Sequence, residues 1–155
     1  MTTALQSQAD VVVIGGGIAG SATAYELAKR GASVVLFDKG EIANEQSSRN
    51  WGWGSQMRNP AEAPIQQLAQ SIWPTLEGEL GADIEWVQKG GMYLAHNPVE
   101  FARLQRAAEV MAATGVPAHT LTRSEVEAMI PEISGEWHGA YYTANNGHAD
   151  PLKTT

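Results

Sequence analysis

Three glycines near the start of the chain have the spacing of a turn that binds phosphate. Gly15, Gly17 and Gly20 directly follow the apolar residues 11–14. The first glycine permits a tight turn, the second lets a pyrophosphate approach the backbone, and the third lets a helix pack closely on a strand. A helix that starts at Ile18 would add free N–H groups and the positive end of its dipole. The pattern predicts a dinucleotide-binding turn.

Asp38 lies at the position where dinucleotide-binding turns commonly have an acidic residue. It follows residues 33–37 (SVVLF), in which four apolar residues come after a serine, and lies 18 residues after Gly20, a position from which a carboxylate can bind ribose hydroxyls. Both apolar runs are continuous, which is typical of strands buried on both faces. With a helix between them that ends near Gly31, they predict a parallel βαβ unit. We expect Ile18, Ala19 and Lys39 to lie beside the nucleotide as well. The alternative is a glycine-rich turn that binds nothing, with Asp38 as a solvated charge.

Composition narrows the class of protein. The 155 residues are 43% hydrophobic and 17% charged, with a net charge of −7 and no cysteine. These values fit a globular protein, argue against a nucleic-acid surface, and exclude disulfides and a cysteine nucleophile. The four histidines are scattered, so no metal site is expected. The N-terminus carries no secretory signal and no apolar run is long enough to span a membrane. We expect a cytoplasmic protein and leave contact with the inner membrane open.

Three helix starts follow a long loop over residues 40–58. Asn59, Asn97 and Thr122 each precede a glutamate by three residues, which is the pattern of a capping box. Pro74 should kink or interrupt the first of these helices, and the second should end at Gly115. Strands are expected at residues 91–95 and 139–142. The apolar residues of the first helix recur along one side: Ile65, Leu68, Ala69, Ile72, Leu76 and Leu80.

The sequence resembles the N-terminal part of a known family. DVVVIGGGIAGSATAYELAKRGASVVLFDKG and the following SSRNWGWGSQMRNP are similar to the FAD-dependent amino-acid and amine oxidoreductases. This is the D-amino-acid oxidase superfamily, with sarcosine oxidase β subunits, glycine oxidases and D-amino-acid dehydrogenases. KGGMYLA and GAYYTANNGHADPL match its later course, so the resemblance covers nearly the whole chain.

The resemblance implies an α/β fold with an α+β second part. Residues 1–84 would form a Rossmann-like FAD-binding start, and residues 85–155 the beginning of a mixed-sheet substrate domain. Only two strands of the nucleotide sheet can be recognised, whereas a doubly wound sheet needs more. We therefore expect an incomplete chain.

The resemblance also implies cofactor and substrate contacts. Trp51 and Trp53 could stack near the flavin or the substrate, or pack the loop down. Arg58 could bind a substrate carboxylate through a bidentate pair, or be a surface arginine. No histidine lies between Glu41 and Ala95, so a covalent flavin link through this loop is not expected. The residues that should line FAD, or else form an exposed polar turn, are Ser47, Ser48, Arg49, Asn50, Trp51 and Gly52.

The implied activity is FAD-dependent oxidation of an amino acid or secondary amine. Hydride would pass to flavin N5 and the imine would be hydrolysed, with oxygen or a quinone chain as electron acceptor. The sequence identifies no catalytic residue; residues 148–151 should form a turn, and a direct role for Asp150 is not expected. A homo- or hetero-oligomer is left open. The alternatives are an inactive N-terminal fragment, a flavin-holding subunit, or another Rossmann flavin or NAD dehydrogenase.

Overall fold

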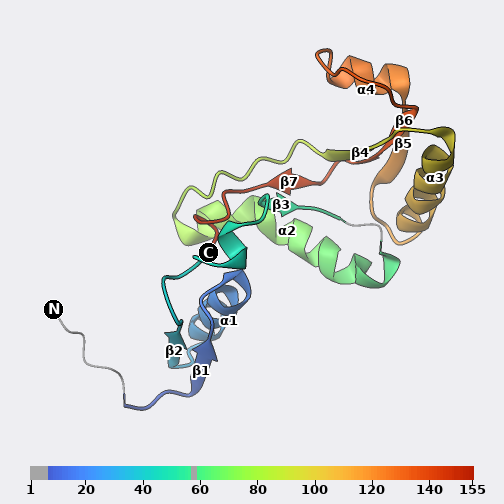
Figure 1. Cartoon of the computed structure of the whole chain (residues 1–155). Coiled ribbons are helices and arrows are strands. Elements are labelled where there is room, and N and C mark those ends of the chain that lie inside the picture. Colours follow the sequence, from blue (N-terminus) through green and yellow to red (C-terminus); the bar gives the residue numbers. More distant parts are fainter. Residues whose placement is uncertain (1–6, 57–58) are drawn as a thin grey trace. The chain divides into compact units, whose positions relative to one another are not determined.

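The computed structural model describes residues 7–56 and 59–155, which divide into two compact units (Figure 1). The first unit comprises the described residues up to Gly52 together with Asp150–Thr155, and the second comprises Trp53–Ala149. Each unit has its own sheet and helices.

The predicted boundary between an FAD-binding part (residues 1–84) and a substrate domain (residues 85–155) is a division by function, and it is not the same as this division into compact units. The compact units separate after Gly52 and before Asp150, whereas the expected boundary concerns which part holds a cofactor and which part holds a substrate. That boundary stays a prediction.

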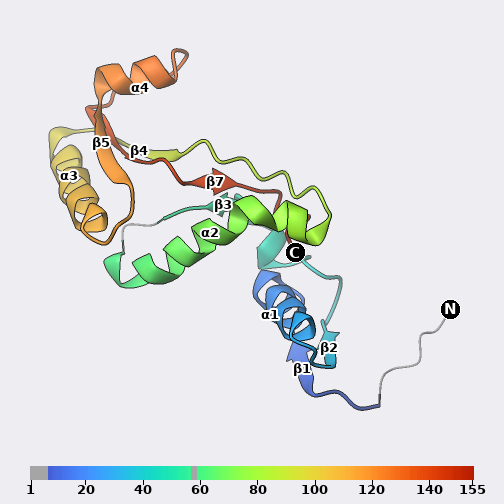
Figure 2. The ribbon, with the colours of Figure 1, turned by 180° about the vertical axis from the view of Figure 1, so that it is seen from behind.

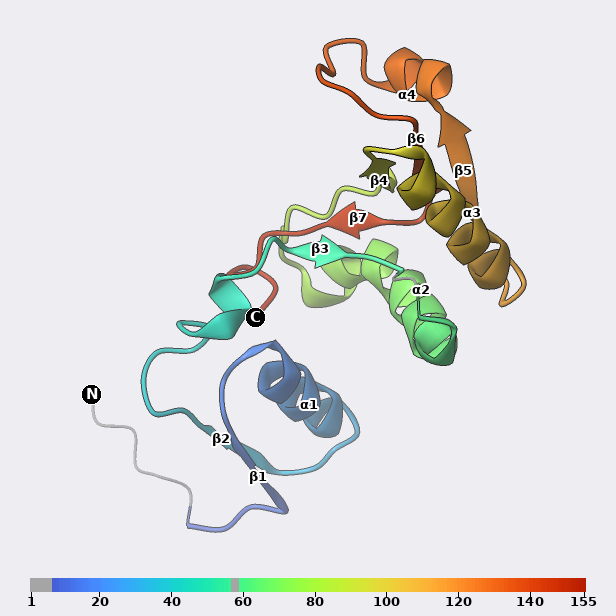
Figure 3. The same ribbon diagram turned by 45° about the vertical axis from the view of Figure 1, so that its right-hand side comes forward.

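The first unit contains the predicted βαβ element. Strand β1 (Val11–Ile14) leads through the glycine turn into helix α1 (Ile18–Lys29), and strand β2 (Val34–Phe37) returns parallel to β1 (Figure 3). Gly31 follows the helix with a φ of +88°, the left-handed conformation that suits glycine at a helix end. The order, type and parallel pairing of these elements confirm the prediction.

The expectation that both faces of this sheet are buried is wrong for the described structure. Val13 lies against α1, with Cγ1 3.4 Å from the ideal Cβ position at Gly20. Val12 and Ile14 are 55% and 87% exposed. Successive side chains of a strand point to opposite faces. Because α1 covers only one face of the two described strands, side chains on the other face are exposed to solvent.

The second unit is built on a three-stranded antiparallel sheet. Its strands are β4 (Gly91–Ala95), β5 (Ala118–Thr122) and β6 (Gly139–Thr143), in the order β4-β6-β5. β4 and β6 confirm the predicted strands. β5 was not predicted because its sequence, AHTLT, has no continuous apolar run, and its strand conformation depends on pairing with β6 along its whole length.

Helices cover this sheet and follow the predicted starts. Helix α3 (Pro98–Ala112) packs on β5 and β6 (Figure 1). The short helix α4 (Arg123–Met129) follows β5. A 3-10 turn η2 (Pro60–Glu62) leads into helix α2 (Ala63–Leu80), which Pro74 does not interrupt (Figure 2). The core beneath α3 is made by side chains from helix and sheet: Ala95, Leu104, Ala108, Met111, Val116 and Tyr141.

Short elements occupy parts of the chain where no regular structure was predicted. The 3-10 turn η1 spans Gln46–Ser48, and strand β3 (Trp53–Gly54) pairs antiparallel with strand β7 (Gly147–His148). In residues 7–56 and 59–155, no helix is both long and apolar enough to span a membrane.

Replacing Thr122 with alanine should destabilise the second unit by about 1 kcal/mol, the usual cost of losing a helix cap. The Thr122 N–H and hydroxyl both donate to Glu125 Oε2 at 2.7 Å, and the Thr122 hydroxyl accepts the Glu125 N–H. These bonds hold the pKa of Glu125 below its usual value. Urea unfolding measures the loss, and Thr122→Ser is the control: serine keeps the capping hydroxyl, so the expected change is within about 0.5 kcal/mol. Equal losses in both variants would contradict a specific cap.

Candidate functional site

The glycine turn has the close contact that the spacing predicts. Gly15 has a φ of +109°, and its N–H donates to the carbonyl of Phe37 on the neighbouring strand at 2.7 Å. A Cβ at Gly20 would lie 1.8 Å from the carbonyl oxygen of Gly15. No side chain can occupy that space, so the third glycine lets α1 begin directly against the end of β1.

The N-terminus of α1 is met by a hydroxyl from the later loop. Gly17 is the N-cap residue and has no side chain to cap the helix. Ser47 Oγ accepts the N–H of Ile18 at 2.9 Å, and a Cβ at Gly17 would lie 2.8 Å from this oxygen. The absence of a side chain at Gly17 therefore makes room for Ser47. The N–H groups of Ala19 and Gly20, in the first turn of the helix, have no acceptor inside it.

Asp38 braces the glycine turn. Its Oδ2 accepts the N–H of Gly16 at 2.7 Å and its Oδ1 accepts the N–H of Gly40 at 2.8 Å. The bond from Gly16, and then that from Gly40, lowers the pKa of Asp38. A carboxylate has about four lone-pair sites, so these bonds leave room for a hydroxyl donor. The predicted ribose contact fits this geometry and stays a prediction.

Two further residues join the loop to the turn, and the sequence analysis missed both. The Ala43 N–H donates to the carbonyl of Gly16 at 2.9 Å, and Ala43 is buried with a φ of +65°. The side chain of Ile42 lies against Gly16, where a Cβ would come within 2.2 Å of Ile42 Cδ1. One feature of the sequence could have indicated these contacts: position 16, which the motif leaves variable, is a glycine, and a side chain there would collide with Ile42. Asp38, Ile42, Ala43 and Ser47 thus all fold back onto residues 16–18.

The two cations expected beside the cofactor, Lys39 and Arg49, both lie next to one glutamate. Lys39 Nζ lies 2.9 Å from Glu45 Oε1, and a terminal nitrogen of Arg49 lies 3.8 Å from Glu45 Oε2. The contact with Glu45 raises the pKa of Lys39, and the same contact lowers the pKa of Glu45. The three side chains are largely exposed. Their geometry shows a surface ion cluster beside the turn, and a role in cofactor binding stays a prediction.

The remaining loop residues shape the loop itself. The Ser48 hydroxyl donates to the Glu45 carbonyl at 3.1 Å, and Asn50 Oδ1 accepts the Gly52 N–H at 2.6 Å. Gly52 has a φ of +63°, so it closes a tight turn after Asn50. Contacts of Ser48, Asn50 and Gly52 with a cofactor stay predictions.

The two tryptophans of the loop behave differently. Trp53 is half-buried, and its ring centroid lies 5.1 Å from that of Tyr93. Its Cζ2 comes within 3.0 Å of the ideal Cβ position at Gly91. Trp51 is 86% exposed. Trp53 therefore packs within the second unit, which is one of the two alternatives considered for these tryptophans. Trp51 does not pack in this way.

Alanine substitutions should separate the two tryptophans. Trp53→Ala removes an aromatic contact with Tyr93, and we expect a loss of roughly 2–3 kcal/mol, below the 3–5 typical of fully buried large aromatics. Trp51→Ala should change stability by less than about 0.5 kcal/mol. Chemical unfolding of both variants gives the comparison. A larger loss for Trp51→Ala than for Trp53→Ala would contradict this assignment.

The other predicted site residues have clear positions. Arg58 lies outside the described residues, so its role toward a substrate carboxylate is untested. His148 belongs to β7 and pairs with Trp53. Asp150 Oδ1 accepts the N–H groups of Leu152 and Lys153 at 2.9 and 2.8 Å. The turn expected at residues 148–151 is therefore wrong in position: pairing with β3 holds His148 in a strand, and the turn begins at Pro151, with Asp150 as its cap.

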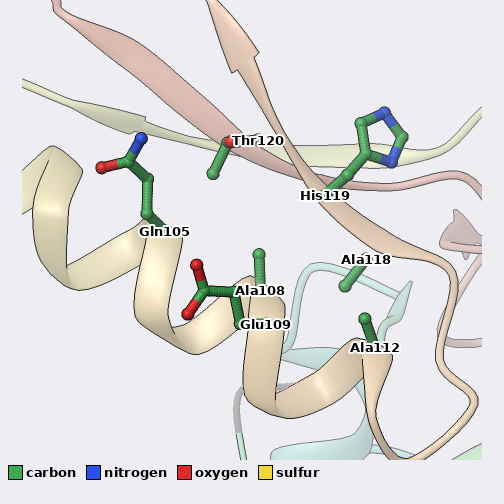
Figure 4. Close-up of a pocket in the computed structure, with 7 residues that line it drawn as sticks. All are labelled: Gln105, Ala108, Glu109, Ala112, Ala118, His119 and Thr120. Atoms are coloured by element: carbon green, nitrogen blue, oxygen red, sulfur yellow. The ribbon is translucent and has the colours of Figure 1, made fainter.

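An open hollow of about 260 Å³ lies between α3 and β5 (Figure 4). It is shallow, and three of its lining residues are alanines. None of its lining residues belongs to the glycine turn, so it is not part of the phosphate site. Its residues are Gln105, Ala108, Glu109, Ala112, Ala118, His119 and Thr120.

Comparison with known proteins gives a family. The family model described as FAD dependent oxidoreductase, DAO, matches residues 10–155. Human mitochondrial sarcosine dehydrogenase is 32% identical over 97% of the chain, which covers 17% of that protein. Glycine oxidase of Geobacillus kaustophilus is 35% identical over 89% of the chain, covering 39% of it. Sarcosine oxidase subunit beta of an Arthrobacter species is 34% identical over 81% of the chain, covering 32% of it.

Solved structures share the fold. Glycine oxidase from Geobacillus kaustophilus has a TM-score of 0.87 and 30% identity, with 94% of this chain and 42% of that chain covered. The L-amino acid deaminase from Proteus myxofaciens has a TM-score of 0.87 and 29% identity, with 98% and 36% covered. The chain therefore spans less than half the length of the relatives and structures it matches.

Proposed function

We propose a function from one premise: the chain belongs to the DAO family of FAD dependent oxidoreductases. FAD is the cofactor of this family. We infer that the chain holds the FAD of an enzyme that oxidises an amino acid or a secondary amine. When bound, FAD supplies the hydride acceptor, so that the substrate carbon beside nitrogen is oxidised to an imine, which water hydrolyses.

The observation that carries the proposal is the closed glycine turn. Gly20 lies against Gly15, and Asp38 and Ser47 fold back onto residues 16–18. The N–H groups at the start of α1 would donate to the pyrophosphate. Ser47 accepts one of them and still has its own proton to donate to a phosphate oxygen. Asp38 would accept the ribose hydroxyls with its remaining lone pairs.

The substrate class is supported by the relatives. A sarcosine dehydrogenase, a glycine oxidase and an L-amino acid deaminase are, by name, proteins that act on amino acids or a secondary amine. We propose the same class for the enzyme to which this chain contributes. The proposal keeps the cytoplasmic location predicted from the sequence, and a multi-subunit assembly, which the subunit name of sarcosine oxidase beta supports.

The 155-residue chain alone should hold FAD without turning over substrate. It spans 42% of the glycine oxidase chain whose fold it shares, and the sequence assigns no catalytic base to it. This agrees with a flavin-holding part, one of the alternatives above.

A chimera tests the proposed activity. In it, this chain replaces the matched N-terminal part of glycine oxidase from Geobacillus kaustophilus. We expect the chimera to retain FAD, and glycine or sarcosine to bleach its visible flavin absorption under anaerobic conditions. The same chimera with Gly20→Ala should be colourless. A folded chimera that holds no FAD, or whose bound FAD neither glycine nor sarcosine reduces, would contradict the proposed role of this chain.

A further inference from the structure

Three charged side chains of the first unit form a cluster in the loop that follows β2. Glu45 Oε1 lies 2.9 Å from Lys39 Nζ, and Glu45 Oε2 lies 3.8 Å from a terminal nitrogen of Arg49. The carboxylate of Asp38 acts electrostatically on both Lys39 and Glu45. We call Lys39, Glu45 and Arg49 the loop ion cluster.

The loop ion cluster is part of the segment that folds back onto the glycine turn. Asp38, which precedes Lys39 in the chain, accepts the N–H of Gly16 at 2.7 Å. Ser47, which lies between the glutamate and the arginine of the cluster in sequence, accepts the N–H of Ile18 at 2.9 Å. Residues adjoining the cluster therefore contact the turn at which the pyrophosphate is proposed to bind.

Glu45 opposes the binding of a phosphate in two ways. It carries the same sign of charge as the phosphate, and it pairs with two cations that could otherwise neutralise the phosphate. Together with Asp38, it balances the charges of Lys39 and Arg49, so these four side chains carry no net charge. The turn thus offers N–H donors to a pyrophosphate, whereas the charge of the loop ion cluster is already compensated.

The carboxylate of Glu45 is not needed to shape the loop. The Ser48 hydroxyl donates to the main-chain carbonyl of Glu45 at 3.1 Å, and the main-chain N–H of Arg49 donates to the carbonyl of Gln46 at 3.2 Å. Within the described residues, the contacts of the Glu45 carboxylate are those with the two cations. Removal of its charge should therefore release the cations and leave the main-chain bonds of the loop in place.

The ion pairs of Glu45 are weak enough to be exchanged. All three side chains of the loop ion cluster are more than half exposed. Water and salt screen such pairs, so they contribute little to stability. Arg49 is the more distant of the two cations, and a guanidinium can donate to two phosphate oxygens at once. A phosphate can therefore replace Glu45 as the partner of Arg49 at little cost.

We propose that Glu45 lowers the affinity of the turn for FAD, because it holds Lys39 and Arg49 until the pyrophosphate replaces it as their anionic partner. This inference rests on the proposed function, since it takes FAD as the ligand. It adds a residue that limits the affinity to those that promote binding, which are the glycines of the turn and Asp38.

Replacing Glu45 with glutamine tests this role on the purified chain. Glu45→Gln should raise FAD affinity at low ionic strength by about threefold or more, and added salt should reduce the gain because it screens exposed charges. ADP, which has the pyrophosphate and lacks the flavin, should show the same gain. Fluorescence quenching measures the affinity for FAD, and calorimetry measures that for ADP. Glu41→Gln, the same charge change in the same loop, should have a smaller effect.

A double-mutant cycle shows whether Glu45 acts through its cations. Arg49→Gln should cost more FAD affinity in the Glu45→Gln background than in the wild type, because in the wild type Glu45 competes with the phosphate for Arg49. Residues that act on one another give such non-additive effects. Independent action of Glu45 and Arg49 would give additive changes in binding free energy.

Three results would overturn the proposal. The first is an affinity for FAD and ADP that Glu45→Gln leaves unchanged or lowers; a lower value would mean that Glu45 supports the site. The second is an equal gain in Glu41→Gln, which would mean that net charge alone matters. The third is additivity of Glu45→Gln and Arg49→Gln. Failure of the proposed function is recognised separately, because neither the wild-type chain nor any variant would then bind FAD.

Discussion

Replacing Gly20 with alanine should abolish measurable FAD binding or weaken it by at least about tenfold, a free-energy loss of about 1.4 kcal/mol or more. The new Cβ would lie 1.8 Å from the Gly15 carbonyl oxygen and 3.0 Å from its carbon. These are backbone atoms, so α1 would have to move away from β1. The N–H groups of the helix would then no longer meet the pyrophosphate. Quenching of FAD fluorescence measures the affinity.

Gly78 gives a matched control. It lies within α2, and nothing comes within 4 Å of the ideal position of a Cβ there. Gly78→Ala should leave FAD affinity unchanged and raise stability by about 0.5–1 kcal/mol, because glycine is a poor helix former. Wild-type affinity in Gly20→Ala would show that the contact between Gly15 and Gly20 is not needed for the site.

The second large effect is expected at Asp38. Asp38→Asn replaces one accepting oxygen with an NH₂ group, which cannot accept the N–H of Gly16 or of Gly40. We expect FAD affinity to fall by about tenfold, in line with lost bonds to a charged group, and the cofactor-free chain to unfold at a lower temperature. Glu41→Gln is the control: the same charge change in the same segment, at a carboxylate for which the described structure shows no bond to residues 15–20.

The effect of Asp38 should depend on pH in a defined direction. Its pKa is lowered because the N–H groups of Gly16 and Gly40 stabilise the carboxylate. The bonds from Gly16 and Gly40 to the ionised Asp38 therefore contribute their full stabilisation above the ordinary pKa of aspartate, about 3.9. This stabilisation is lost as the pH falls through the lowered pKa. Melting temperatures of wild type and Asp38→Asn should differ near pH 7 and converge in acid. A difference that persists undiminished well below pH 3 would contradict an ionised brace.

The sequence predicted those parts of the structure that are determined by interactions between residues close together in the chain. The glycine turn, α1 and the parallel strands follow from residues within one βαβ unit. The caps at Asn97 and Thr122 bond residues only three positions away. Backbone sterics and short-range hydrogen bonds decide these features, so a single sequence contains them.

The rest depends on contacts that no local pattern encodes. Ser47 reaches Ile18 across 29 residues. Ala43 binds Gly16 through its backbone N–H, which every residue type except proline has. The strands β3 and β7 have two residues each and exist through their mutual pairing. The direction in which α2 faces is set by Gln67 and Gln70 bonding distant carbonyls, against the apolar pattern of the helix.

The central claim is that the closed glycine turn of this chain is an FAD site. Titration of FAD with the purified wild-type chain tests it directly, with NAD as a competitor and Gly20→Ala in parallel. We predict saturable binding of one FAD per chain, little competition by NAD, and loss of binding in Gly20→Ala. A wild-type chain that binds NAD and not FAD, or FAD binding that survives Gly20→Ala undiminished, would contradict the claim.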